Sequence, residues 1–157
     1  MGYFDIAQIC LNGHLINSRM KEAQQHNKNY CDICGKATIN KCQKCDKEIH
    51  GYHHGGGNEF SYSLDKVPSC CYNCGKPYPW TEAKIKATEE YIDLLENLSV
   101  EEKNSLKKGI DDILAETPRT KLAIATIKKH AIKLGQTGKD IFVDLASEAI
   151  KKLLLGL

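Results

Sequence analysis

Four short segments of the chain each place two metal-binding side chains two or three residues apart. Three are Cys-x-x-Cys pairs and the fourth is Cys-Leu-Asn-Gly-His. Two ligands at such a spacing can hold one tetrahedral ion from a tight turn, and sulfur with imidazole favours zinc over hard cations. The predicted ligands are Cys10, His14, Cys31, Cys34, Cys42, Cys45, Cys71 and Cys74. They predict two structural Zn²⁺ ions per chain, each closed by four protein ligands.

The order of the segments favours one way of sharing the two ions. Sequential pairing joins residues 10–14 with 31–34, and residues 42–45 with 71–74. The short interval between Cys34 and Cys42 suits this pairing better than a cross-brace, and the intervals 14–31 and 45–71 each fit a hairpin within one ribbon. The cross-brace, which pairs the first segment with the third, stays open as the alternative.

Several residues beside these segments need an interpretation. Gly35 and Gly75 follow the second cysteine of their pairs, where a positive φ is expected and glycine adopts it without steric cost. Cys70 adjoins Cys71 and has the wrong spacing, so we expect a spare thiol that is buried as a small hydrophobe. His26, five residues before Cys31, competes with His14 as the imidazole ligand.

The elements that must position these ligands divide the chain near residue 80. All eight cysteines lie between Cys10 and Cys74, whereas the second half is rich in Ala, Leu, Ile, Lys and Glu. The first half has few aliphatic residues, so metal is expected to replace part of its core. We predict a tandem zinc-ribbon domain over residues 1–80 and a helical region of about four helices over residues 81–157. The fold class is α+β: a small, metal-stabilised, β-rich tandem ribbon followed by a helical hairpin or bundle.

Capping signals and apolar spacing delimit the helices of the second half. The first is expected from Thr81 to about Asn97, and Ser99 to Glu102 is a capping box that begins the second. Thr117 and Pro118 begin a third helix that Gly135 ends. The last follows Thr137 and carries an apolar stripe to the end of the chain. That stripe is interpreted either as core or as an association surface for a protein partner or a second copy.

Composition and charge narrow the class of protein. Charged residues make up 27% and hydrophobic residues 41%, which is typical of a globular protein, and no apolar run reaches the roughly 20 residues of a membrane span. The first residues include Asp5 and no basic stretch, so a signal peptide is not expected, and a cytoplasmic location is. Clustered cysteines in that setting indicate metal binding before disulfides.

The distribution of charge bears on nucleic-acid binding. Residues 81–118 contain five basic and ten acidic residues, and residues 119–157 contain eight basic and three acidic ones. The basic stretch could contact phosphates, but pairing with the acidic helices or simple solvation is favoured. Nucleic acid is therefore kept as an alternative partner that is not favoured.

The segment His50 to Gly57 contains three histidines and three consecutive glycines. Either it is a flexible hairpin loop within the second ribbon, which is favoured, or a recognition loop. The histidines at positions 50, 53, 54 and 130 are expected at the surface and not as ligands. No HExxH motif, catalytic triad or complete phosphate-binding loop occurs in the sequence, so enzyme activity is not expected.

These residues together resemble a known family. The order Cys-Leu-Asn-Gly-His, CxxCG, CxxC and CxNCG-Lys-Pro-Tyr-Pro-Trp-Thr is similar to that of an uncharacterised bacterial family of tandem zinc-ribbon proteins, a domain of unknown function. The segments Glu-Thr-Pro-Arg-Thr and Asp-Leu-Ala-Ser-Glu-Ala extend the resemblance over most of the chain. It implies two zinc ribbons and a helical tail in a bacterial cytosolic protein, and it implies no activity.

The sequence thus predicts a non-enzymatic, zinc-binding interaction or adaptor protein. The ribbons would serve as a recognition head, and the helices would drive self-association or partner docking in a bacterial complex connected with stress or phage defence. The alternative is a zinc-ribbon protein that binds nucleic acid.

Overall fold

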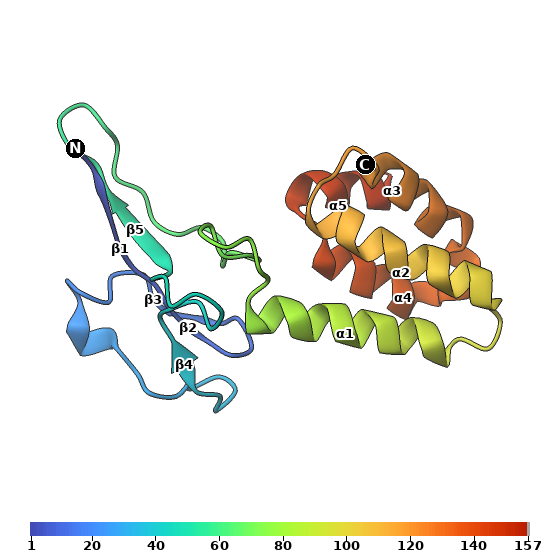
Figure 1. Ribbon diagram of the computed structural model, residues 1–157, viewed down its shortest axis with the longest axis horizontal. Coiled ribbons are helices and arrows are strands. Elements are labelled where there is room, and N and C mark those ends of the chain that lie inside the picture. The colour runs from blue at the N-terminus through green and yellow to red at the C-terminus, as the bar shows by residue number, and fades with distance from the viewer. Residues whose placement is uncertain (157) are drawn as a thin grey trace. The chain divides into compact units, whose positions relative to one another are not determined.

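The chain folds into two units, which a computed structural model describes over residues 1–156. The first unit, Met1–Ala83, is called the ribbon unit, and the second, which begins at Lys84, is called the helical unit. Short antiparallel strands lie in the first and helices make up the second (Figure 1). The expected α+β class is therefore confirmed.

Five short strands form two small sheets in the ribbon unit. They are β1 (Tyr3–Ile6), β2 (Gln8–Cys10), β3 (Leu15–Asn17), β4 (Thr38–Ile39) and β5 (His50–His54), with a short 3-10 helix at Gln24–His26. β2 lies between β3 and β4, and β1 pairs antiparallel with β5 (Figure 1). The two sheets bring the beginning of the chain against segments far along the sequence.

The strand β5 corrects the expectation of a loop for His50 to His54, whereas Gly55 to Gly57 lie in the connection that follows the strand. His50 to His54 pair with β1, with Tyr3 opposite His54 and Phe4 opposite His53. Gly51 is needed within this strand, because a Cβ atom there would lie 2.1 Å from the Ser18 carbonyl oxygen. The glycines are thus explained in part by a close backbone approach, a role that glycine serves in strands.

The core of the ribbon unit is small and includes metal-ligand candidates. The indole Nε1 of Trp80 donates a hydrogen bond to the Pro68 carbonyl (2.9 Å), and the Trp80 ring stacks on Tyr78 with centroids 4.8 Å apart. The buried hydrophobic residues of this cluster are Ala7, Ile9, Cys42, Ile49, Cys71, Tyr78 and Trp80. Such a small core agrees with the expectation that metal supplies part of the stability.

The helices are α1 (Pro79–Leu94), α2 (Val100–Leu114), α3 (Thr120–Lys129), α4 (Ala131–Leu145) and α5 (Glu148–Leu155). The capping box at α2 is confirmed, because the Ser99 side chain accepts a hydrogen bond from the Glu102 N–H and the Glu102 carboxylate accepts one from the Ser99 N–H. Thr117 accepts from the Arg119 N–H (3.1 Å) just before α3. The helices pack around one cluster of buried apolar side chains.

The last two predicted helices are wrong in their limits. The third ends at Lys129 and not at Leu134, and Gly135 lies within α4 with a φ of +66°. The Tyr91 hydroxyl donates a hydrogen bond to the Leu134 carbonyl at this kink (2.8 Å). Ser147 then interrupts the expected last helix, because its side chain accepts from the Ile150 N–H and begins α5. The described residues therefore form five helices and not about four.

The apolar stripe expected on the last helix is mostly core. The cluster of the helical unit includes Phe142, Leu145, Ala146 and Ile150, so the interpretation as core is confirmed for this part of the stripe. Leu153 and Leu155 remain exposed at the end of α5. His130 is also buried, contrary to the expected surface position.

Candidate metal centres

Three of the four ligand segments fold into the same tight turn. The N–H of the residue after each pair donates to the carbonyl of the first cysteine: Gly35 to Cys31, Asp46 to Cys42 and Gly75 to Cys71, at 2.7 to 2.9 Å. In return, the N–H of the first cysteine in each turn donates to the carbonyl of the lysine that comes directly after Gly35, Asp46 or Gly75. Gly35 and Gly75 have φ values of +70° and +69°, which confirms the positive φ expected there. The turn places both sulfurs of a pair on the same side.

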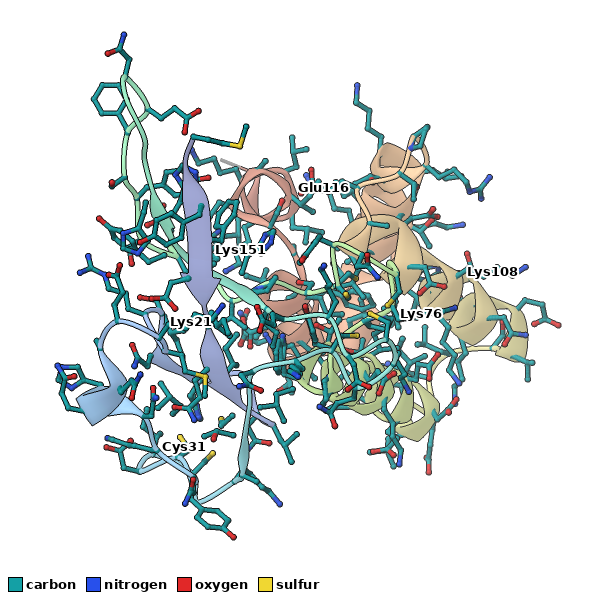
Figure 2. The ribbon with its side chains drawn as sticks, turned by 60° about the vertical axis from the view of Figure 1, so that its left-hand side comes forward. Lys21, Cys31, Lys76, Lys108, Glu116 and Lys151 are labelled. Carbon is teal, nitrogen blue, oxygen red and sulfur yellow. The ribbon has the colours of Figure 1, made fainter. Side chains whose placement is uncertain are left out.

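The first centre gathers the ligand atoms of Cys10, His14, Cys31 and Cys34. His14 Nδ1 lies 3.4 Å from the Cys10 sulfur and 3.5 Å from the Cys31 sulfur, and the sulfurs of Cys10 and Cys34 are 3.7 Å apart. Metal bonds of about 2.3 Å to sulfur and about 2.0 Å to nitrogen give tetrahedral edges of about 3.8 and 3.5 Å. The donor atoms therefore already have the spacing of a tetrahedral site. Sulfur atoms gather beside the labelled Cys31 (Figure 2).

The second centre gathers four sulfurs, those of Cys42, Cys45, Cys71 and Cys74. The sulfurs of Cys42 and Cys74 are 3.7 Å apart, as are those of Cys45 and Cys71. Backbone N–H groups point at the sulfurs, for example from Lys44 to Cys42 at 3.4 Å. The sulfur–sulfur distances of 3.7 Å again match the edge of a tetrahedron with metal–sulfur bonds of about 2.3 Å.

The structure brings all eight predicted ligands together in the sequential grouping and not in the cross-brace. His26 lies exposed on the short 3-10 helix, outside both groups. Cys70 is exposed, which corrects the expected buried thiol. The reason is the turn itself: Cys70 precedes the first ligand and pairs with Pro77 across the base of the hairpin, as Tyr30 pairs with Ala37.

The thiols of the second centre influence one another's pKa. Burial raises the pKa of Cys71, but N–H donors from Cys74 and Asn73 and the neighbouring thiols outweigh burial and lower it to about 6. At Cys74 the Lys76 N–H lowers the pKa, whereas burial and the three other thiols raise it to about 11. Burial and the adjacent thiols also raise the pKa of Tyr78. Because metal ions bind the thiolate form, binding at this centre should release protons, the proton of Cys74 among them.

Sequence reasoning missed one further group of candidate ligands. Asp5, Glu22 and His54 come from distant parts of the ribbon unit, and their ligand atoms lie within 4.8 Å of one another. No spacing signal could reveal them, because the pairing of β1 with β5 brings them together. His54 was expected to be an ordinary surface residue.

The fold and the paired turns define an α+β protein with two four-ligand clusters that could each hold a metal ion. The chain belongs to a bacterial protein family. The sequence model of this family, described as an uncharacterised protein conserved in bacteria (DUF2321), matches residues 3–154. The resemblance inferred from the sequence is thereby confirmed. No curated protein and no solved structure matches the chain. None of the helices in residues 1–156 is long and apolar enough to cross a membrane.

Proposed function

We propose that both centres hold structural Zn²⁺ and that the chain is a non-enzymatic interaction protein. The observation that carries the proposal is the number of donors, because each cluster offers four ligand atoms with tetrahedral spacing. Four protein ligands leave no position for water or substrate, whereas a catalytic zinc keeps one open. Sulfur with imidazole is a donor set that zinc prefers. The ions would hold the ribbon unit rigid and have no part in a reaction.

The docking part of the proposal concerns the helical unit. A pocket of about 320 Å³ lies between α3, α4 and α5, and its apolar wall includes Ile127, Val143 and Leu155. Lys128 and Lys139 stand at the same pocket. An apolar hollow with cations beside it suits an apolar side chain next to a carboxylate, as an acidic amphipathic helix presents. We propose that the chain assembles through this pocket.

A pair of leucine substitutions tests assembly without disturbing the core. Leu155 is 59% exposed at the pocket, and Leu122 is 56% exposed on α3 and does not line it. Native-gel and cross-linking analysis of the chain in its own cells should show a species larger than 17.6 kDa for wild type and Leu122→Glu. Leu155→Glu should shift it to the monomer, because a carboxylate would be buried at the contact. A monomer for wild type would overturn the docking proposal.

Metal analysis tests the zinc part separately. Native mass spectrometry of the purified chain should show two zinc ions per chain, with all eight ligands engaged. Cobalt in place of zinc should give the strong absorption of tetrahedral thiolate sites, and the cobalt of the two cysteine centres should carry no exchangeable water. An exchangeable water on either cysteine centre would overturn the structural assignment and favour catalysis.

A row of aromatic rings on the ribbon unit keeps nucleic-acid binding as a second candidate. Tyr72 stacks on His50 (3.9 Å between centroids), His50 stacks on Phe4 (4.1 Å), and His53 stacks on Tyr62 (4.7 Å). Tyr72 and Tyr62 are both about half exposed. Exposed rings in a row can stack unpaired bases. Thiolate-bound zinc would lower the net charge below the +2 of the sequence, which is why this candidate ranks second.

Two tyrosines separate this candidate from the first. Tyr72 is part of the ring row, whereas Tyr30 is also exposed but precedes Cys31 in a different turn. If the row binds single-stranded RNA or DNA, Tyr72→Ala should weaken binding by about 1–3 kcal/mol per lost stack in a fluorescence-anisotropy titration, and Tyr30→Ala should not. The affinity should also fall with salt. Equal affinities for both variants, or no binding at low salt, would exclude the second candidate.

A further inference from the structure

A third group of potential metal ligands lies in the ribbon unit apart from the cysteine clusters. Asp5 stands on β1, His54 ends β5, and Glu22 lies in the turn that precedes the 3-10 helix. One donor atom of each lies within 4.8 Å of the other two. We propose that these three side chains bind a third metal ion, a divalent first-row transition ion held by nitrogen and oxygen.

The imidazole of His54 carries the argument. Its Nε2 atom is buried and has no hydrogen-bond partner among residues 1–156. Glu22 Oε2 lies 3.3 Å away, within reach of an ion pair if the ring is protonated, but the two atoms do not have the geometry of a hydrogen bond. A buried polar atom left unpaired costs about 1–3 kcal/mol, so it calls for an explanation. A metal ion between the two side chains would accept the lone pair of Nε2.

Neighbouring rings hold His54 in this orientation. Tyr3 stacks on the imidazole with centroids 4.6 Å apart and planes 14° apart, and Tyr52 meets it edge-on at 4.6 Å. The guanidinium of Arg19 lies over the Tyr52 ring, 3.8 Å from its centroid. The imidazole is therefore packed from more than one side, and its Nε2 cannot turn to solvent without disrupting these contacts. Ligands of metal sites are commonly fixed in this way by their neighbours.

The two carboxylates are also fixed. The Tyr3 hydroxyl donates to Glu22 Oε1 (2.9 Å), which leaves Oε2 toward the histidine. Asp5 is 2% exposed, and its Oδ2 accepts only the Glu22 N–H (3.2 Å) among the bonds found in residues 1–156, so this oxygen keeps a free lone pair. Its Oδ1 accepts from the Lys21 N–H (3.0 Å) and the Ile6 N–H (2.6 Å). The hydrogen bond from the Glu22 N–H to Asp5 Oδ2 thus also positions the backbone of Glu22.

The local charge also favours a cation. Two carboxylates lie close together beside the half-buried imidazole of His54, and the nearby ammonium group of Lys21 pairs with Glu48 (3.5 Å) instead of with them. Lys21 lies beside β1 (Figure 2). A divalent ion would offset the repulsion between the carboxylates. Nitrogen with two carboxylates suits Mn²⁺, Fe²⁺, Co²⁺ or Zn²⁺, and three protein ligands leave positions for water. The third centre would therefore be open, whereas the cysteine centres are closed.

Manganese provides a probe that discriminates between the centres, because thiolate sites prefer zinc. The purified chain is loaded with zinc and then titrated with Mn²⁺, whose free ion is followed by electron paramagnetic resonance. Zinc and manganese bound per chain are then summed. We expect three ions in wild type and two in His54→Ala and Glu22→Gln. Affinity at the third site should fall at least about tenfold in either variant.

A second histidine of the same strand is the matched control. His53 adjoins His54 on β5, but its ring stacks on Tyr62 and it is not one of the three grouped ligands, so His53→Ala should still bind three ions. Glu22 is exposed, and Glu22→Gln keeps an oxygen for the Tyr3 hydroxyl, so this variant should fold even if His54→Ala does not. Two ions in wild type, or three in Glu22→Gln, would overturn the proposal and leave an ordinary ion pair between Glu22 and His54.

Discussion

Gly35, Asp46 and Gly75 occupy the same place in three equivalent turns, directly after the second cysteine. Their φ values are +70°, +58° and +69°, so all three residues have a left-handed backbone conformation. Glycine adopts this conformation freely, whereas a residue with a Cβ atom pays roughly 1–2 kcal/mol, and Asp less than most. The turn geometry therefore depends on the backbone of this one residue, and the turn at Asp46 shows that aspartate can replace glycine there.

Substitutions at Gly75 should measure this cost. A Cβ atom at Gly75 would meet nothing within 4 Å, so a change in stability would report backbone strain and not a clash. Gly75→Ala should destabilise the zinc-loaded ribbon unit by about 1 kcal/mol, because strain outweighs the smaller entropy gain in the unfolded chain. Gly75→Asp should cost less. Urea unfolding followed by Trp80 fluorescence checks both, and an alanine variant as stable as wild type would contradict the argument.

At the scale of elements, Glu102 connects the beginning of α2 with the segment around α4. Its carboxylate closes the capping box with Ser99, and it accepts hydrogen bonds from the Lys133 ammonium at 2.8 and 2.9 Å. The Nδ1 atom of buried His130 lies 3.5 Å from it. One acidic side chain thus serves both the N-terminus of a helix and a contact between helices, which is where the helix dipole favours negative charge.

The pKa of Glu102 predicts how acid affects the helical unit. The Lys133 ammonium, and after it the Ser99 N–H, lower this pKa below its ordinary value of 4.5. A lowered folded-state pKa means that the ionised carboxylate stabilises the fold above pH 4.5 and that this contribution is lost as the pH falls through the folded-state pKa. Glu102→Gln should therefore lower the urea midpoint near neutral pH, and its difference from wild type should vanish in acid.

An exposed glutamate provides the control for this prediction. Glu90→Gln, on the exposed side of α1, removes the same charge without touching the Glu102–Lys133 contact. It loses only a surface pair with Lys86 (3.8 Å), so it should leave the urea midpoint near that of wild type. The helical far-UV signal is the readout. A Glu102→Gln deficit that stays the same from neutral pH into acid would show that the ionised carboxylate is not the stabilising form.

For the whole molecule, the spacing of residues in the sequence predicts those features that depend only on residues adjacent in the chain. The positive φ at Gly35 and Gly75 and the capping box at Ser99 depend on a few adjacent residues, and the structure contains both. The break at Ser147 was missed because the apolar spacing runs on through it, and only the packing of Phe142 and Ile150 in one core shows how two helices share the stripe. Periodicity alone does not locate such a break.

Long-range pairing was the part that the sequence did not reveal. β1 ends at Ile6 and β5 begins only at His50, and the pairing of the two strands brings Asp5 and His54 together. Strand register depends on which faces become buried, and short strands with few aliphatic residues specify it weakly in sequence. The sequence therefore predicts a loop over residues 50–57, whereas His50 to His54 form a strand through their pairing with β1.

Removal of metal should unfold the ribbon unit and leave the helical unit folded. Each unit has a buried cluster of its own, and only that of the ribbon unit includes candidate ligands. Structural zinc contributes about 10–16 kcal/mol in small modules, which is comparable to the 5–15 kcal/mol of net stability of a whole domain, so its loss should unfold the unit. Trp80, the single tryptophan, is buried in the ribbon core, and its emission should shift to the red as a chelator removes the ions.

The helical far-UV signal supplies the internal control for this experiment, because most of the helical residues lie in the second unit. It should persist while the Trp80 emission shifts, and added Zn²⁺ should restore the emission. Loss of both signals at the same chelator concentration would show that the units do not fold independently. An unchanged Trp80 emission, with both cysteine centres shown to be empty by metal analysis, would mean that the hydrophobic cluster around Ile9, Ile49 and Tyr78 suffices and that the cysteines are not structural ligands.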